Sequence, residues 1–155
     1  MTEIQQEICP ISGDDLFIIL DRENERFEYA IHCHPEYEIN VVINTNGTRV
    51  IGDSEESFLG LDFVMIGPYI PHVWRSTKYD NRVITIQFSP DLLNYPIMNK
   101  RLFLPIKQLL ADSMQGLQFY GPDAERIKDE IVELTRIQGF QTATMFLNIL
   151  NSLTH

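Results

Sequence analysis

The chain has 155 residues and a formal net charge of −10 at pH 7, with 22 acidic side chains against 12 lysines and arginines. This length suits one compact domain, whose core is large enough to form without disulfides or a structural metal. Phosphate backbones are bound through clustered lysine and arginine, so the acidic balance argues against direct nucleic-acid binding by this chain.

The N-terminal stretch MTEIQQEICPISGDD has neither the basic nor the apolar segment of a secretory signal. No apolar run approaches the roughly 18 residues needed to cross a bilayer, so we expect a cytoplasmic protein without membrane contact. Cys9 and Cys33 are too few and too isolated for a disulfide framework, and we expect two structurally unremarkable thiols. The acidic run between Asp14 and Glu28 is expected to be a solvated face.

From Leu16 to Phe88 the sequence consists of short β-rich runs separated by turn residues. Many short strands at near-even spacing predict a β-sandwich or a small barrel. The segment Asn44–Gly47 predicts a hairpin turn that joins YEINVVI to TRVIGD, because asparagine and glycine tolerate the positive φ of such turns.

After Ser89 the apolar period changes to three and four residues, which is typical of helices. One helix is expected to begin at Pro105, a second at Gly121-Pro122-Asp123, and a third carries the last apolar stripe. The run Gly116–Gly121 predicts a short edge strand. The fold class is therefore α+β, mainly β, with a barrel over residues 1–90 and helices over residues 91–155.

The apolar stripes of the last two helices are wider than the flank of one small barrel needs to cover. Exposed apolar surface usually marks an interface, so these residues are expected to contact either the barrel or a second copy of the chain in a homodimer. The candidates are Ile127, Ile131, Leu134, Phe146, Leu147 and Leu150.

Two of the four histidines lie in the segment HCHPEYE, residues 32–38. His32 and His34 share one face of a strand, whereas Glu38 would lie roughly 13 Å away if the strand were straight. A turn through Pro35 would return Glu38 to the histidine pair. With His72, the set of three imidazoles and one carboxylate predicts a divalent transition-metal site for Zn, Ni, Fe or Mn.

The segment RVITIQF has an apolar face and a mixed face, and we expect the mixed face to line the barrel. An aromatic wall and several uncharged hydrogen-bonding groups would suit a sugar or another small metabolite. In the alternative, these polar atoms pair with one another or with water. By the same alternation, Tyr37 is assigned to the core and Arg49 to the surface or rim. The predicted effector-binding residues are Asn40, Asn44, Trp74, Thr85 and Gln87.

The pattern H-x-H-x3-E, followed by G-x-D and P-x2-P-H, resembles the two motifs of the cupin barrel. More narrowly, HCHPEYEINVVI, GTRVIGD and GLDFVMIGPYIPHVWRS resemble the N-terminal sensor domain of AraC-type regulators. In these bacterial proteins a cupin effector domain precedes a helix-turn-helix DNA reader. The likeness covers roughly Leu16 to Leu153, and the helical half resembles the part of that family that provides a dimer surface. Many such domains keep the histidine motif without binding metal.

The resemblance implies an effector-sensing and dimerisation domain without catalysis of its own. The DNA-binding domain would follow residue 155, so the chain is either a cut regulator or a stand-alone sensor. The rival interpretation is a small metal-dependent cupin enzyme, an isomerase or dioxygenase, built on the same four residues. Such an enzyme needs an acid or base beyond the metal ligands, and the sequence offers no convincing candidate. A binding module that merely shares the ancestry is the third alternative.

Overall fold

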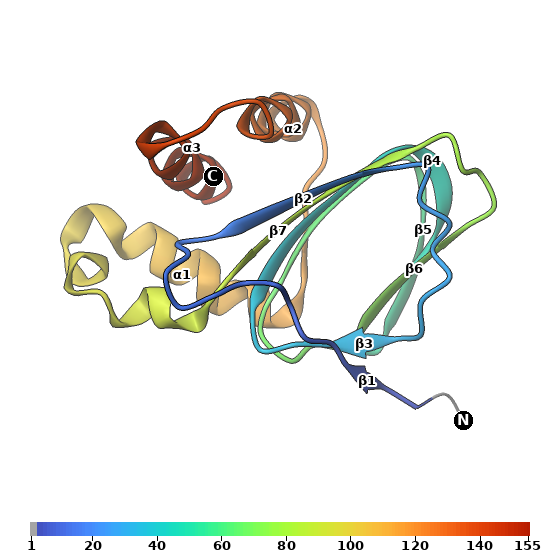
Figure 1. Cartoon of the computed structure of the whole chain (residues 1–155), viewed down its shortest axis with the longest axis horizontal. Helices are drawn as coiled ribbons and strands as arrows, with labels where there is room; N and C mark the ends of the chain where they lie inside the picture. The colour runs from blue at the N-terminus through green and yellow to red at the C-terminus, as the bar shows by residue number, and fades with distance from the viewer. Residues whose placement is uncertain (1–2) are drawn as a thin grey trace.

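The computed structural model describes residues 3–155 and consists of a curled β-sheet followed by helices (Figure 1). This arrangement confirms the predicted α+β, mainly β class. No helix among the described residues is long and apolar enough to span a membrane. The strands are β1 (Gln5–Gln6), β2 (Ile18–Glu23), β3 (His32–Cys33), β4 (Tyr37–Ile51), β5 (Ser54–Ile66), β6 (His72–Ser76), β7 (Arg82–Phe88) and β8 (Leu117–Gln118). The α-helices are α1 (Leu104–Asp112), α2 (Pro122–Leu134) and α3 (Phe140–Ser152), and 3-10 turns fill much of the stretch from Pro90 to Phe103.

Strand β4 pairs with three other strands of the barrel. It pairs with β5 along almost its whole length, with β7 over its first half and with β6 over its second half. β2 pairs with the far side of β7, while β3 and β1 extend the sheet beyond β6. Because one long strand changes partner midway, the sheet curls and encloses an interior (Figure 1).

A β-bulge at Asn44 makes this change of partner possible. The β4–β5 register shifts between Ile43 and Thr45, and Asn44 has a φ of 63°. One extra residue reverses the alternation of side chains along the rest of the strand. The predicted hairpin at Asn44–Gly47 is therefore wrong: β4 runs on to Ile51, and the turn at Gly52-Asp53 leads into β5.

Gly47 lies within the β4–β6 pairing and not in the predicted hairpin turn. It lies opposite Ser76 where β4 and β6 pair. A β-carbon at this position would overlap the backbone carbonyl of Arg75. Only glycine allows the two strands to approach this closely.

The outer face of the barrel forms the main hydrophobic core with the helices. Ile39, Ile86 and Phe88 are fully buried there, and Phe146 of α3 lies against Phe88 with ring centroids 5.2 Å apart. The residues proposed for a dimer or core contact all join this cluster, with Leu147 partly buried. Those that are fully buried are Ile127, Ile131, Leu134, Phe146 and Leu150. The structure thus places them in contacts within the chain.

The helix boundaries and the edge strand agree with the sequence pattern. Pro105 and Pro122 lie in the first turns of α1 and α2, where the missing amide hydrogen removes no helical bond. β8 pairs with β5 and confirms the predicted edge strand.

Candidate functional site

Three of the four predicted metal ligands come together at one end of the barrel interior. Ligand atoms of His34, Glu38 and His72 lie within 4.8 Å of one another, and all three residues are buried. The chain leaves β3 after Cys33 and enters β4 at Tyr37, so the bend expected at Pro35 is confirmed. As a result, His34 Nε2 lies 3.1 Å from Glu38 Oε1, and His72 Nε2 lies 3.5 Å from Glu38 Oε2.

All three barrel histidines are held in the same way. Nδ1 of His32, His34 and His72 lies 3.0, 3.1 and 2.7 Å from a backbone carbonyl two residues away. A carbonyl can only accept, so Nδ1 carries the proton in each ring and leaves Nε2 for another partner. Metal-ligating histidines are commonly oriented by such a bond. The arrangement therefore suits coordination through Nε2.

The charges of the group follow from its burial and its close contacts. Burial opposes ionisation of Glu38, but His72, His34 and Gln87 outweigh it and lower the pKa of the carboxyl. Burial likewise acts to lower the pKa of His34, yet the hydrogen bond and the charge of Glu38 raise it overall. For His72, burial dominates and lowers the pKa. The contacts within the group thus favour the ionised form of Glu38 and act to favour the charged form of His34, whereas burial favours the neutral form of His72.

His72 passes the chemical test for a metal ligand. Its Nε2 is buried and has no hydrogen-bond partner. Because Nδ1 holds the proton of this neutral ring, a bare lone pair on Nε2 faces the Glu38 carboxylate. A lone pair and a carboxylate that face each other without a proton between them are complementary to a cation. His34, Glu38 and His72 therefore fit a divalent transition metal, and their use as ligands stays a prediction.

His32 flanks this group without joining it. It lies opposite His72 in the β3–β6 pairing, and the two ring centroids are 4.4 Å apart. Its Nε2, however, lies 3.3 Å from Oε2 of Glu7. In this conformation His32 Nε2 contacts Glu7, and it would have to leave Glu7 to become a fourth ligand.

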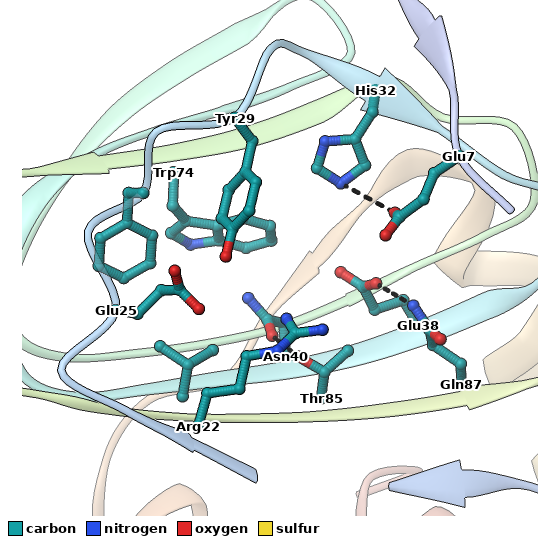
Figure 2. A pocket seen from close by; sticks show the side chains of 12 residues that line it. Glu7, Arg22, Glu25, Tyr29, His32, Glu38, Asn40, Trp74, Thr85 and Gln87 are labelled. Atoms are coloured by element: carbon teal, nitrogen blue, oxygen red, sulfur yellow. Dashed lines mark hydrogen bonds and ion pairs between the residues drawn. The ribbon is translucent and has the colours of Figure 1, made fainter. Parts of the chain in front are cut away.

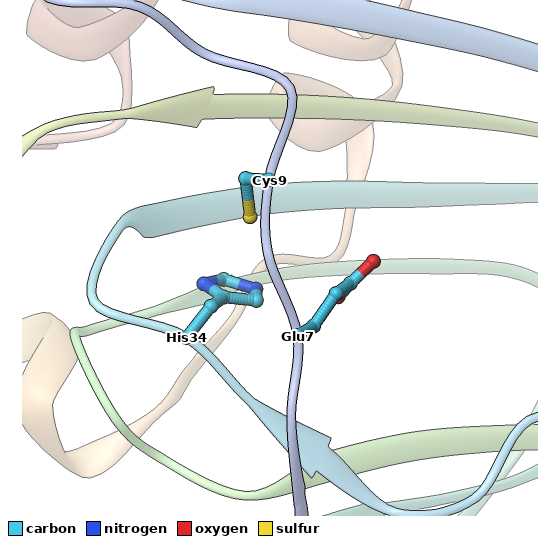
Figure 3. A group of neighbouring side chains, drawn as sticks. All are labelled: Glu7, Cys9 and His34. Carbon is cyan, nitrogen blue, oxygen red and sulfur yellow. The ribbon is translucent and has the colours of Figure 1, made fainter.

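The N-terminal segment supplies two neighbours of the site that sequence reasoning missed. β1 runs parallel to β3, which carries Glu7 and Cys9 to His34 (Figure 3). Burial, followed by the nearby Glu36 carboxylate, raises the pKa of the Cys9 thiol. Because metals bind the thiolate, Cys9 is a poor ligand here. No periodic pattern in residues 3–10 signals this pairing, which joins distant parts of the sequence.

A cavity of about 90 Å³ occupies the barrel interior next to His32 and Glu38 (Figure 2). Four of the five predicted effector-binding residues line it, namely Asn40, Trp74, Thr85 and Gln87. Asn44 does not. The bulge turns Asn44 to the surface, where its Nδ2 donates to the carbonyl of Asp80 at 2.6 Å. Its assignment to the pocket assumed unbroken alternation from Asn40 and is corrected.

The polar side chains of the cavity are only partly satisfied by one another. Thr85 Oγ1 donates to Asn40 Oδ1 at 2.6 Å, and Gln87 Nε2 donates to Glu38 Oε1 at 3.1 Å. Gln87 Oε1, in contrast, is buried without a partner. Unmet hydrogen-bonding capacity of this kind is what a polar ligand can satisfy.

Arg49 belongs to a buried ion pair that reaches the cavity wall through Trp74. Its guanidinium donates to Asp62 Oδ1 at 2.8 Å, and Asp62 Oδ2 accepts from Trp74 Nε1 at 2.8 Å. Arg49 is 5% exposed, so its assignment to the surface or rim is wrong. The bulge at Asn44 reverses the facing of the later β4 residues and turns Arg49 inward. The ion pair fixes the indole that forms the aromatic wall.

The sequence matches no protein-family model and no curated protein, whereas the fold has relatives among solved structures. Apo ToxT K231A from Vibrio cholerae strain SCE256 aligns with a TM-score of 0.56 and 12% identity, covering 92% of this chain and 55% of ToxT. A cupin-2 domain, Rru_A2000 from Rhodospirillum rubrum, aligns with a TM-score of 0.35 and 12% identity over 65% of this chain and 76% of that one. The chain thus shares its fold with about half of ToxT, across barrel and helices alike.

Proposed function

We propose that the chain is the effector-sensing domain of an AraC-type transcriptional regulator. ToxT is an AraC-family regulator. The observation that carries the proposal is a partly unsatisfied polar cavity inside a barrel whose fold, helices included, matches that of ToxT. A small molecule bound there would control an attached DNA-binding domain, provided that it binds one arrangement of the domains more tightly than the other.

The proposed setting is the bacterial cytoplasm, with DNA contact made by a domain outside this chain. The net charge of −10 favours that division, because this chain would be repelled by phosphates. A homodimer remains part of the proposal. Its interface would use apolar side chains that the barrel leaves exposed in the helical half, and these include Ile97, Leu102, Leu104 and Phe140. Leu102→Glu should then give a monomer by light scattering.

The sequence of the gene beyond codon 155 provides the first test of this function. We expect a helix-turn-helix domain there, and the longer protein should bind specific DNA that the present chain does not bind. Gln87→Leu in the longer protein should keep DNA binding but weaken the effector response in a reporter assay. Sequence-selective, salt-sensitive DNA binding by residues 1–155 alone would contradict the assignment, as would a continuing gene without a DNA-binding domain.

A metal-dependent cupin enzyme is the second candidate, and the unpartnered Nε2 of His72 beside Glu38 favours it. His34, Glu38 and His72 would hold Zn, Ni, Fe or Mn, and His32 would become a fourth ligand if it left Glu7. Such a metal would supply Lewis-acid polarisation of a bound oxygen. The protein would orient the imidazoles through their Nδ1 bonds and place Gln87 beside the carboxylate.

Elemental analysis tests this second candidate directly. Near-stoichiometric metal that is lost in His72→Ala and kept in the exposed-site control His155→Ala would support it. No uptake after incubation with Zn²⁺ or Ni²⁺ at neutral pH would eliminate it, while leaving the sensor proposal intact.

A further inference from the structure

The barrel cavity has two chemically different ends (Figure 2). Tyr29, Trp74 and Glu25 lie together at one end, and Phe27 also lines the cavity. Glu38 and Gln87 lie at the other end, beside His32 and Glu7. On β2 and β7, Arg22 is opposite Val83 and Ile18 is opposite Gln87. Val83 and Gln87 both line the cavity and are four residues apart on β7, which corresponds to roughly 13 Å of strand. The cavity is therefore long for its volume.

The aromatic end holds a carboxylate, that of Glu25, without a close ion-pair partner among the described residues. Three carboxylates line the cavity, those of Glu7, Glu25 and Glu38, against the single guanidinium of Arg22. Glu7 pairs with His32, and Glu38 pairs with His34. Among residues 3–155, no basic side chain lies within 4.0 Å of the Glu25 carboxylate.

Tyr29 and Trp74 lie beside Glu25 in the cavity (Figure 2). Burial, then the neighbouring Glu25 carboxylate, raises the pKa of Tyr29 to about 12, so the phenol beside Glu25 stays neutral. Trp74 is 5% exposed and held by Asp62, which fixes its ring as a wall. A carboxylate next to aromatic rings is the combination that binds an organic ammonium group.

The opposite end points independently to a ligand that donates a hydrogen bond. Gln87 is 3% exposed, lines the cavity and has an Oε1 without any donor. The contact of its Nε2 with the Glu38 carboxylate fixes the orientation of the amide, because an amide oxygen would be repelled there. A buried acceptor left unpaired is unfavourable, so a ligand that brings an N–H or O–H to this point gains affinity.

We propose that the cavity binds a small, extended amine cation that carries a hydroxyl or a second N–H at its far end. The ammonium group lies beside Glu25 between the aromatic side chains, and the far donor reaches Gln87 Oε1. This inference rests on the proposed sensing function and adds the chemical class of the effector. It concerns the barrel without a bound metal, in which the ammonium group contacts Glu25 and not the group of His34, Glu38 and His72.

Trp74 is the only tryptophan of the chain, so intrinsic fluorescence reports on this cavity. The test titrates the protein, in buffer with EDTA at pH 7, with three probes of similar length: 5-aminopentan-1-ol, 1,5-pentanediol and 5-hydroxypentanoate. We expect the amino alcohol to bind about tenfold more tightly than the diol, and the hydroxy acid to bind least. Saturation-transfer NMR on the same samples provides a second readout.

Glu25→Gln should reduce binding of the amino alcohol to the level of the diol, because the amide keeps the shape of the carboxylate but carries no charge. Glu28→Gln is the matched control, since it makes the same change in net charge at an exposed carboxylate outside the cavity and should leave binding unchanged. Pentylamine lacks the hydroxyl, so it should bind the wild type more weakly than the amino alcohol does. The Gln87→Leu variant should bind pentylamine and the amino alcohol with equal affinity.

Tighter binding of the diol or the hydroxy acid would overturn the charge assignment and leave the sensing function standing. No saturable response to any probe at millimolar concentrations, in either readout, would also overturn the inference. The sensing function itself is decided separately by the gene beyond codon 155 and by DNA binding of the longer protein.

Discussion

The two faces of β4 and β7 differ in almost every physical respect although they belong to the same strands. On the outer face, Ile39 and Ile86 are fully buried against an apolar helical layer. On the inner face, Glu38 and Gln87 are nearly as buried, yet they lie among charges, and Gln87 leaves an acceptor unpaired. The outer face stabilises the fold through apolar burial. The inner face leaves a hydrogen-bond acceptor unpaired, which is unfavourable in a core that serves only stability.

The largest effect is expected where the outer face meets the helices. Phe146 is fully buried and stacks on Phe17 with ring centroids 4.4 Å apart. Phe146→Ala should lower the free energy of unfolding by about 3–5 kcal/mol, through lost burial and a cavity. Denaturant unfolding measures this loss. An effect below about 1 kcal/mol would mean that α3 contributes little to the core.

The second-largest effect on stability is expected at the buried ion pair of Arg49 and Asp62. Arg49→Met leaves Asp62 with Trp74 as a partner but without a countercharge, and should destabilise the fold by roughly 3 kcal/mol. Arg49→Met with Asp62→Asn should recover part of the loss, because the isolated charge is gone. A double-mutant cycle checks the coupling, and strictly additive effects would contradict a direct pair.

Gly47→Ala probes the crossing of β4 and β6. The added methyl group overlaps the carbonyl of Arg75, so the strands must separate, at a cost of about 1–3 kcal/mol. Gly13→Ala is a suitable control, because a β-carbon there meets nothing within 4 Å. Equal midpoints of thermal unfolding for the two variants would show that the strands do not approach closely.

The smallest effect is a pH-dependent one at the rim. The hydrogen bond from Arg82 outweighs burial and lowers the pKa of Asp21, so this pair stabilises the fold above the unfolded pKa of aspartate, and the contribution disappears as the pH falls through the folded value. Arg82→Gln should therefore cost up to about 1 kcal/mol near neutral pH, and the difference from the wild type should vanish in strong acid. A difference independent of pH would exclude the ion pair as its cause.

Short-range patterns predicted most of the fold. The switch from strand to helix period, the prolines of α1 and α2, and the bend at Pro35 each depend on a few neighbouring residues, and the structure agrees with them. The errors share one origin. A bulge at Asn44 has no clear sequence signal, since Asn-Gly nearby also favours a hairpin, yet it moves Asn44 out of the pocket and turns Arg49 inward.

The candidate site was predictable only in part. Residues brought together by alternation and one turn, such as His34 and Glu38, could be grouped from the sequence, and the motif added His72. Glu7 and Cys9 could not be found, because their approach depends on a parallel pairing of β1 with β3. The aromatic end was also missed except for Trp74, since Glu25 and Tyr29 lie between β2 and β3, where no regular period exists.

Two adjacent residues of β7 provide the most direct test of the difference between the faces. Ile86 faces the helices and Gln87 faces the cavity. Unfolding free energy and the Trp74 response to 5-aminopentan-1-ol would be measured on Ile86→Ala and Gln87→Leu. We predict that Ile86→Ala loses about 2–5 kcal/mol of stability and keeps wild-type binding, while Gln87→Leu stays within about 1 kcal/mol and binds more weakly. Unchanged binding by Gln87→Leu, or weaker binding by folded Ile86→Ala alone, would contradict a ligand site on the inner face.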